Sequence, residues 1–135
     1  MQKPISYRYP AIFYYDDDGI SMDFPDLPGC LPCAENTEEA VNNAEECLAL
    51  HLYGMEQDGD EIPKPTDIRE IKPGSGGVIV LVEAFMPALR DRERNRYVKK
   101  TVSIPSWVDA EGQRAHVNFS QILQQAIIDK LNLRA

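Results

Sequence analysis

The chain has 135 residues, 43% of them hydrophobic, and a formal net charge of −8 at pH 7. This length and composition allow one compact domain with a genuine core plus a small appendage. Residues 1–10 lack the apolar stretch of a signal peptide, and no segment approaches the ~20 apolar residues that a membrane span requires. The 3 cysteines, an odd number without a secretory signal, argue against a disulfide framework. We therefore expect a cytoplasmic protein that does not associate with membranes.

Charge is divided unevenly along the chain. Residues 1–85 contain 17 Asp and Glu against 5 Lys and Arg, a net charge of −12, whereas residues 86–135 contain 5 against 9, a net charge of +4. An acidic region favours a basic protein partner and repels nucleic acid, while a basic region is attracted to phosphate. The sequence therefore predicts two partners of opposite charge.

The first part of the chain has the pattern of a β-hairpin followed by a loop. Apolar residues alternate with period two over 7–15 and again over 20–24, and the turn between these runs includes Gly19, which is able to adopt a positive φ. Prolines and glycines over 25–32 predict an irregular loop, after which residues 33–34 form a short third strand.

A helix is predicted over about 37–57. Asn36 and Glu39 form a capping pair, and the apolar residues that follow recur at helical spacing. Gly59 supplies the expected stop.

The stretch 62–77 is rich in proline and glycine, which predicts an extended connection. The continuous apolar run 78–82 predicts a central strand buried on both faces. Residues 1–86 are therefore expected to form an α+β domain in which one helix packs on an antiparallel sheet.

The remaining residues predict a second, smaller domain after a linker. Residues 87–96 have dense mixed charge and no apolar pattern, which indicates a charged linker or solvated arm. Residues 99–104 alternate as a strand, and a helix with poor propensity follows over 106–115. A stronger helix begins at Asn118 and carries one apolar stripe. The stripe consists of Phe119, Ile122, Leu123, Ala126, Ile127 and Leu131.

The strand predicted over 99–104 needs a partner strand, because a short strand with no neighbour in sequence is not stable alone. The same strand of a second chain, antiparallel about a two-fold axis with both chains' helices beneath, gives a ribbon-helix-helix dimer over 97–135. The alternative is that 99–104 is an edge strand of the N-terminal sheet and that the last helix only packs against the body.

In the ribbon-helix-helix arrangement, the outward side chains of the paired strands enter the major groove of DNA. Those side chains are Lys99, Thr101 and Ser103. Asn118 and Ser120 lie at the start of the second helix, where free backbone N–H groups and a positive dipole end suit a phosphate. These five residues are the predicted DNA contacts.

At several segments the chain resembles the HicB family of antitoxins, and the resemblance covers nearly its full length. The matching segments read YPAIF at 9–13, FPDLPGC at 24–30, EAVNNA at 39–44, DGDEIP at 58–63 and VNFSQILQQA at 117–126. FPDLPGC is the most specific. The resemblance implies a degenerate ribonuclease-H-like domain that binds and blocks a small, basic, RNA-cleaving HicA-type toxin. It also implies a DNA-binding tail that represses the operon, with no catalysis and no cofactor. The strand pairing described above predicts a homodimer or higher even-numbered oligomer.

The resemblance does not locate the toxin-binding surface. Aromatic and acidic residues of the hairpin and of the loop that follows it are candidates, and exposed sheet structure without a partner is the alternative. The candidates are Tyr14, Asp16, Asp17, Asp18, Phe24 and Asp26.

Two rival interpretations involve metals. Cys30, Cys33, Cys47 and His51 have spacings compatible with tetrahedral zinc, which would suit a zinc-stabilised or metal-dependent small enzyme. We expect packing instead, because Cys47 lies on the apolar stripe of the predicted helix, where a free cysteine is usually a small core residue. The aspartates between 16 and 26 could bind a divalent metal for nuclease chemistry, but most lie in a predicted turn, where solvation explains them.

Overall fold

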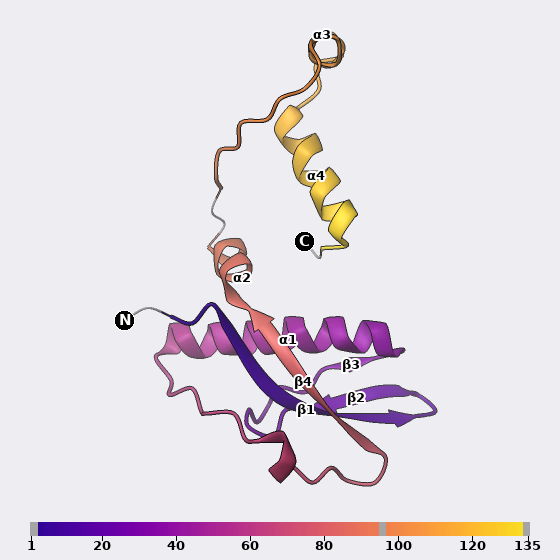
Figure 1. The fold of residues 1–135 in the computed structure, drawn as a ribbon, viewed down its shortest axis with the longest axis vertical. Helices are drawn as coiled ribbons and strands as arrows, with labels where there is room; N and C mark the ends of the chain where they lie inside the picture. Colours follow the sequence, from indigo (N-terminus) through magenta and orange to yellow (C-terminus); the bar gives the residue numbers. More distant parts are fainter. Residues whose placement is uncertain (1–2, 95–96, 134–135) are drawn as a thin grey trace. The chain divides into compact units, whose positions relative to one another are not determined.

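The computed structural model describes residues 3–94 and 97–133 (Figure 1). The chain divides into two compact units, Met1–Tyr97 and Val98–Ala135, here called unit 1 and unit 2. None of the described helices combines the length and the apolar character that crossing a membrane requires.

Unit 1 is built on a four-stranded antiparallel sheet with the strand order β3-β2-β1-β4. The strands are β1 (Ser6–Asp16), β2 (Gly19–Asp23), β3 (Cys33–Ala34) and β4 (Gly77–Phe85). The predicted hairpin and the short third strand are confirmed. Gly19 has a φ of 138°, and a Cβ there would lie 2.7 Å from the carbonyl oxygen of Ala34, so both the turn and the close approach of β3 require glycine.

One helix, α1 (Thr37–Asp58), covers one face of this sheet (Figure 1). Its predicted ends are confirmed. The Asn36 side chain accepts a hydrogen bond of 2.9 Å from the backbone N–H of Glu39, and Gly59 ends the helix in the left-handed conformation with a φ of 72°. The core lies between α1 and the sheet. Its largest fully buried side chains include Tyr9, Phe13, Phe24, Leu27, Leu48, Leu52 and Met86.

The prediction that residues 78–82 form a central strand is wrong. β4 lies at the edge of the sheet and β1 takes the centre. Val82 and Ala84 are buried, whereas Leu81 is 54% exposed and Phe85 is 59% exposed. A continuous apolar run predicts burial on both faces only if a layer covers each face, and here α1 covers one.

The prediction that residues 87–96 form a linker is also wrong for most of the segment. Met86–Glu93 form a helix, α2, which buries Met86, Leu89 and Arg90. Arg90 forms two hydrogen bonds with Glu56 of α1, of 3.0 Å from Nε and 2.6 Å from Nη2. The charge of Arg90 hid the helical spacing of buried positions in this segment. Its burial depends on an ion pair with α1, a partner that the local sequence does not reveal. Residues 95–96 lie outside the described residues.

The connection between α1 and β4 is extended as predicted and includes a short 3-10 helix, η1 (Ile68–Glu70). Asp26 holds it to the loop after β2. One Asp26 oxygen accepts from the Thr66 backbone N–H at 3.0 Å, and the other accepts from the Thr66 hydroxyl at 2.5 Å. The Tyr9 hydroxyl donates to the Pro63 carbonyl, nearer the start of the same connection.

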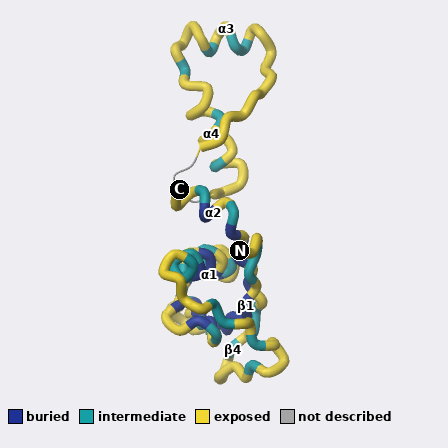
Figure 2. Tube along the Cα trace, turned by 90° about the vertical axis from the view of Figure 1, so that its left-hand side faces the viewer, coloured by how far each residue is buried: buried dark blue, intermediate teal, exposed yellow. Residues whose placement is uncertain are grey.

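Unit 2 contains the two predicted helices, α3 (Ser106–Arg114) and α4 (Phe119–Leu131), and neither contains a buried residue. Figure 2 shows the contrast: buried residues gather in unit 1, while unit 2 is exposed or intermediate. Gly112 lies within α3 because a Cβ there would come within 2.5 Å of the Phe119 ring. Residues 97–105 adopt neither helix nor strand, so they are not the edge strand of the unit 1 sheet that the alternative required.

Candidate functional site

The hairpin tip keeps its predicted residues at the surface. Asp16, Asp17 and Asp18 are exposed, and Asp16 also shapes the turn, because its Oδ1 accepts a 2.9 Å hydrogen bond from the Asp18 backbone N–H. Tyr14 is half-buried, and its hydroxyl accepts from the Gly74 backbone N–H at 3.3 Å. These side chains remain available to a partner.

The other two candidates have structural positions. Phe24 is fully buried in the core, because it continues the inward face of the alternating strand before it, so its side chain offers a toxin no exposed surface. Asp26 uses both carboxylate oxygens on Thr66, so its first role is to hold the 59–76 connection. The sequence could not show this, because Thr66 is distant in the chain.

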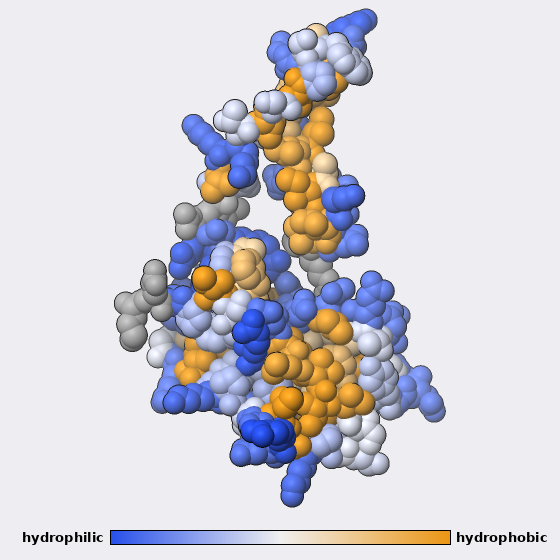
Figure 3. Space-filling view, viewed as in Figure 1, coloured by the Kyte–Doolittle hydropathy of each residue, from blue (hydrophilic) through white to orange (hydrophobic). Residues whose placement is uncertain are grey.

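The face of the sheet opposite α1, here called the open face, is rich in apolar side chains. Side chains alternate along a strand, and the Tyr7 hydroxyl donates to Glu56 of α1, so the odd-numbered positions of β1 face the helix. The even-numbered positions therefore form the open face. The strand register pairs Ile12 with Ile79, Pro10 with Leu81, and Tyr14 with both Gly77 and Ser21. Figure 3 shows apolar side chains gathered over β1 and β4.

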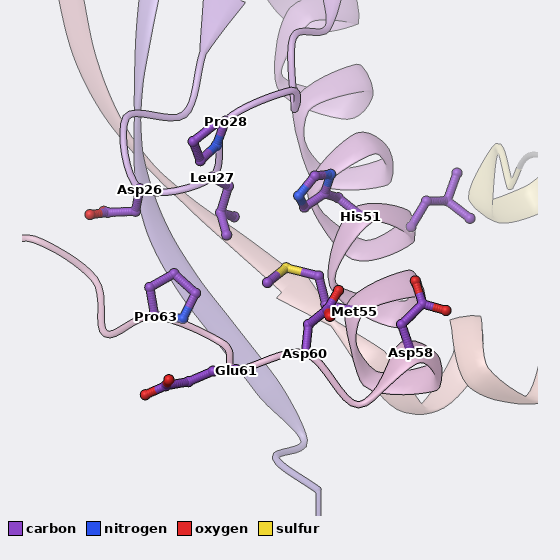
Figure 4. Close-up of a pocket in the computed structure, with 11 residues that line it drawn as sticks. Asp26, Leu27, Pro28, His51, Met55, Asp58, Asp60, Glu61 and Pro63 are labelled. Carbon is purple, nitrogen blue, oxygen red and sulfur yellow. The ribbon is translucent and has the colours of Figure 1, made fainter.

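A groove of about 720 Å³ lies between the loop after β2, the C-terminal half of α1 and the start of the following connection (Figure 4). Leu27, His51 and Met55 point toward the same space, whereas the carboxylates of Asp26 and Glu61 point away from it. The lining is mixed in character. It consists of Asp26, Leu27, Pro28, Leu50, His51, Gly54, Met55, Asp58, Asp60, Glu61 and Pro63.

The groove is acidic. Asp58 is the last residue of α1, and Asp60 and Glu61 follow it in the chain. The last turn of α1 contains no basic residue and already carries the negative end of the helix dipole. These three carboxylates form no ion pair within the part of the chain that the structure describes. Unit 1 thus offers a second surface that favours a cationic partner.

Glu56, one turn away, is not part of this acidic surface. Burial by itself raises its pKa, but hydrogen bonds from Arg90 and Tyr7 outweigh burial and hold the pKa of Glu56 below its ordinary value. Burial and the hydrogen bond to Glu56 raise the pKa of Tyr7 to about 12. This buried cluster fastens α2 to α1 and has a structural role.

The sequence profile described as HicB-like antitoxin of bacterial toxin–antitoxin systems matches residues 9–127. This chain belongs to the HicB-like antitoxin family. Antitoxin HicB 2 of Photorhabdus laumondii is 36% identical over 59 residues, which is 44% of this chain and 42% of that protein. A 14.9 kDa protein of Haemophilus phage HP1 is 36% identical over 62 residues, 46% of this chain and 47% of that protein. The chain thus spans less than half the length of these curated relatives.

Solved structures resemble this HicB family member over a larger share of its length. A chain of a toxin–antitoxin complex from Streptococcus pneumoniae is 26% identical, with a TM-score of 0.56, and the match covers 93% of this chain and 99% of that chain. The Burkholderia pseudomallei antitoxin HicB is 23% identical with a TM-score of 0.55, covering 93% of this chain and 98% of that one. The second likeness supports the α+β fold alone.

Two of the three cysteines of this HicB family member lie together, but the four residues of the zinc hypothesis do not form one group. The Sγ atoms of Cys30 and Cys47 lie 3.4 Å apart, and burial raises the pKa of the Cys30 thiol. Cys33 is exposed, and in the described ranges no group of three or more Cys, His, Asp or Glu side chains could hold a metal ion. His51 lines the groove instead. The zinc hypothesis lacks the geometry it requires.

The predicted DNA contacts of the tail are all exposed. Lys99, Thr101 and Ser103 lie in the segment before α3. The Asn118 side chain accepts from the Gln121 backbone N–H at 3.0 Å, so it caps α4, and Ser120 lies in the first turn. As a cap, Asn118 is already engaged, which leaves its backbone region rather than its side chain for a phosphate.

Sequence reasoning missed two features of the candidate surfaces. The sequence predicts that Leu81 lies in a strand buried on both faces. Leu81 is exposed because α1 covers only the other face of the sheet. The groove carboxylates lie in the DGDEIP segment that carried part of the family resemblance, so a signal was present. Their gathering at the end of α1 depends on how the chain turns after Gly59.

Proposed function

We propose that this protein is an antitoxin whose unit 1 binds and blocks a small, basic, RNA-cleaving HicA-type toxin in the cytoplasm. The observation that carries the proposal is family membership over residues 9–127, joined by the similarity to a chain of a toxin–antitoxin complex. The acidic charge of residues 1–85, 17 Asp and Glu against 5 Lys and Arg, suits a basic partner that itself binds RNA. We further propose that unit 1 is a degenerate ribonuclease-H-like scaffold that acts sterically, with no cofactor and no catalytic step.

Co-purification with the product of the adjacent reading frame tests this function. We expect a small basic protein to bind, and its cleavage of RNA to be suppressed when this chain is added at equal concentration. An unrelated ribonuclease of similar charge serves as the control for non-specific electrostatic inhibition. Absence of binding, or binding that leaves cleavage intact, would contradict the antitoxin proposal.

For unit 2, we propose a ribbon-helix-helix dimer that binds operator DNA and represses the operon. Its helices bury no residue within one chain, and the stripe positions Ile122, Ile127 and Leu131 are exposed. Apolar stripes of this kind are buried in a partner when the domain is complete. Pairing of two 99–104 segments about a two-fold axis would supply the missing strand partner and place Lys99, Thr101 and Ser103 toward the major groove.

Operator binding by Lys99→Ala and Thr101→Ala variants tests the tail. Each should weaken binding by about tenfold, since a base contact contributes about 1–3 kcal/mol, while toxin binding stays unchanged. Lys130→Ala, on the last turn of α4, is the control of equal charge change for Lys99→Ala. Gel-shift titration at two salt concentrations provides the readout, and simultaneous loss of toxin binding would contradict the division into two functional units.

A further inference from the structure

We propose that the open face of the unit 1 sheet is the surface on which the basic toxin docks. This inference rests on the proposed antitoxin function and specifies where that function is carried out. Its centre is the apolar stretch shared by β1 and β4, and its rim is the acidic hairpin at the end of β1.

The exposed apolar side chains carry the first step. Leu81 is 54% exposed and Ile79 is half-buried beside it, while Phe85, 59% exposed, lies further along β4 beyond Glu83. All three lie on the face that α1 does not cover, because the register pairs them with even-numbered residues of β1. Contiguous exposed apolar surface on a folded domain is characteristic of protein interfaces, which combine an apolar centre with a polar rim.

The charges around this centre select the kind of partner. Asp23 is paired with Ile12 and lies on the same face, and Asp16 follows Tyr14 on that face toward the hairpin tip. Between Leu81 and Phe85 on the same face, Glu83 forms an ion pair of 3.2 Å with Arg8, so these two residues add no net charge. The rim is therefore negative, which favours a basic protein. A second acidic copy of unit 1 would place like charges against each other.

The surface is also preformed. β1 is hydrogen-bonded on both sides, and nine residue pairs align β1 with β4. Ile12 is 5% exposed and Pro10 is fully buried, although α1 covers the other face of the sheet. At Gly77 a Cβ would lie 2.8 Å from Ile12 Cγ2 and 2.9 Å from Tyr14 Cε1, so glycine lets these two side chains close the surface. A rigid surface loses little entropy on binding.

Three exposed leucines on separate parts of unit 1 make a matched test. Leu81 lies on the open face, Leu50, 41% exposed, lines the acidic groove, and Leu31, 65% exposed, lies in the loop before β3. Each is changed to Arg, which adds the same side chain and charge at an exposed position. The affinity of each full-length variant for the co-purified toxin is measured by calorimetry, and its unfolding midpoint is recorded.

We expect Leu81→Arg to weaken toxin binding by about 100-fold, the size of an interface hot spot, while Leu31→Arg and Leu50→Arg stay within about threefold. A second variant, Asp17→Lys with Asp18→Lys, leaves the apolar centre intact and should slow association by about tenfold at low salt and less at high salt. Wild-type affinity of Leu81→Arg, or a loss confined to Leu50→Arg, would overturn the open face as the docking surface. Failure of the wild-type chain to bind would instead count against the antitoxin function itself.

Discussion

Units 1 and 2 differ in whether a single chain completes the hydrophobic core. Unit 1 encloses Phe13, Phe24 and Leu48 between α1 and the sheet, while α3 and α4 of unit 2 bury no residue. Both units have regular apolar patterns in the sequence. The difference teaches that a periodic apolar pattern identifies which side chains need to be buried. It does not identify which element or partner buries them. Unit 1 finds most of this cover within the chain, whereas in unit 2 the proposed dimer would supply it.

Phe24→Ala gives the largest expected effect on this comparison. Removing a fully buried aromatic ring from the core should destabilise unit 1 by about 3–5 kcal/mol, measured by urea denaturation. Phe119→Ala, in the exposed part of unit 2, is the matched control and should leave the unit 1 transition unchanged. If Phe24→Ala kept wild-type stability and lost only toxin affinity, Phe24 would be a contact residue after all.

Arg90→Ala should cost about 3 kcal/mol, because it leaves the buried Glu56 carboxylate without its cation. The folded-state pKa of Glu56 lies below its unfolded value. Its ionised form therefore stabilises unit 1 above the unfolded pKa of about 4.3, and this contribution is lost as pH falls through the lower folded pKa. Denaturation at pH 7 and between pH 5 and 3 measures both effects.

Arg8→Ala, which breaks an exposed pair, should cost less than about 1 kcal/mol. Equal costs for the two arginines would contradict a structural role for α2.

Ile122→Glu should prevent the proposed dimer from forming and leave the unit 1 unfolding transition unchanged, because a charge would enter the apolar stripe of α4. Sedimentation velocity over a range of concentrations measures the assembly. Gln124→Glu introduces the same charge on the same helix outside the stripe and should remain dimeric. Dimers that persist in Ile122→Glu would show that unit 2 does not use this stripe for assembly.

Cys33→Ser gives the smallest expected effect, a change within about 0.5 kcal/mol, since Cys33 is exposed and joins no metal-binding group in the described ranges. Metal analysis of both purified proteins accompanies the stability measurement. A stoichiometric zinc ion that disappears in the variant would revive the zinc hypothesis.

The sequence by itself determined the local elements of this protein. The hairpin, the Asn36 and Gly59 ends of α1, and the two tail helices all follow from periodicity, capping and turn chemistry within a few residues of each other. The FPDLPGC segment and the other matching segments also indicate the family without any knowledge of the fold. These local elements are predictable because the interactions that form them join near neighbours.

Only the tertiary structure decided which faces of the elements are buried and which other elements bury them. It placed β4 at an edge instead of the centre, turned most of the expected linker into a helix held by Arg90 and Glu56, and assigned Phe24 to the core. It also placed Asp26 where both carboxylate oxygens accept hydrogen bonds from Thr66. Each of these outcomes depends on partners distant in the chain or on the presence of a second layer. A strand's own residues specify that a face is apolar, but not whether another part of the same molecule will lie against it.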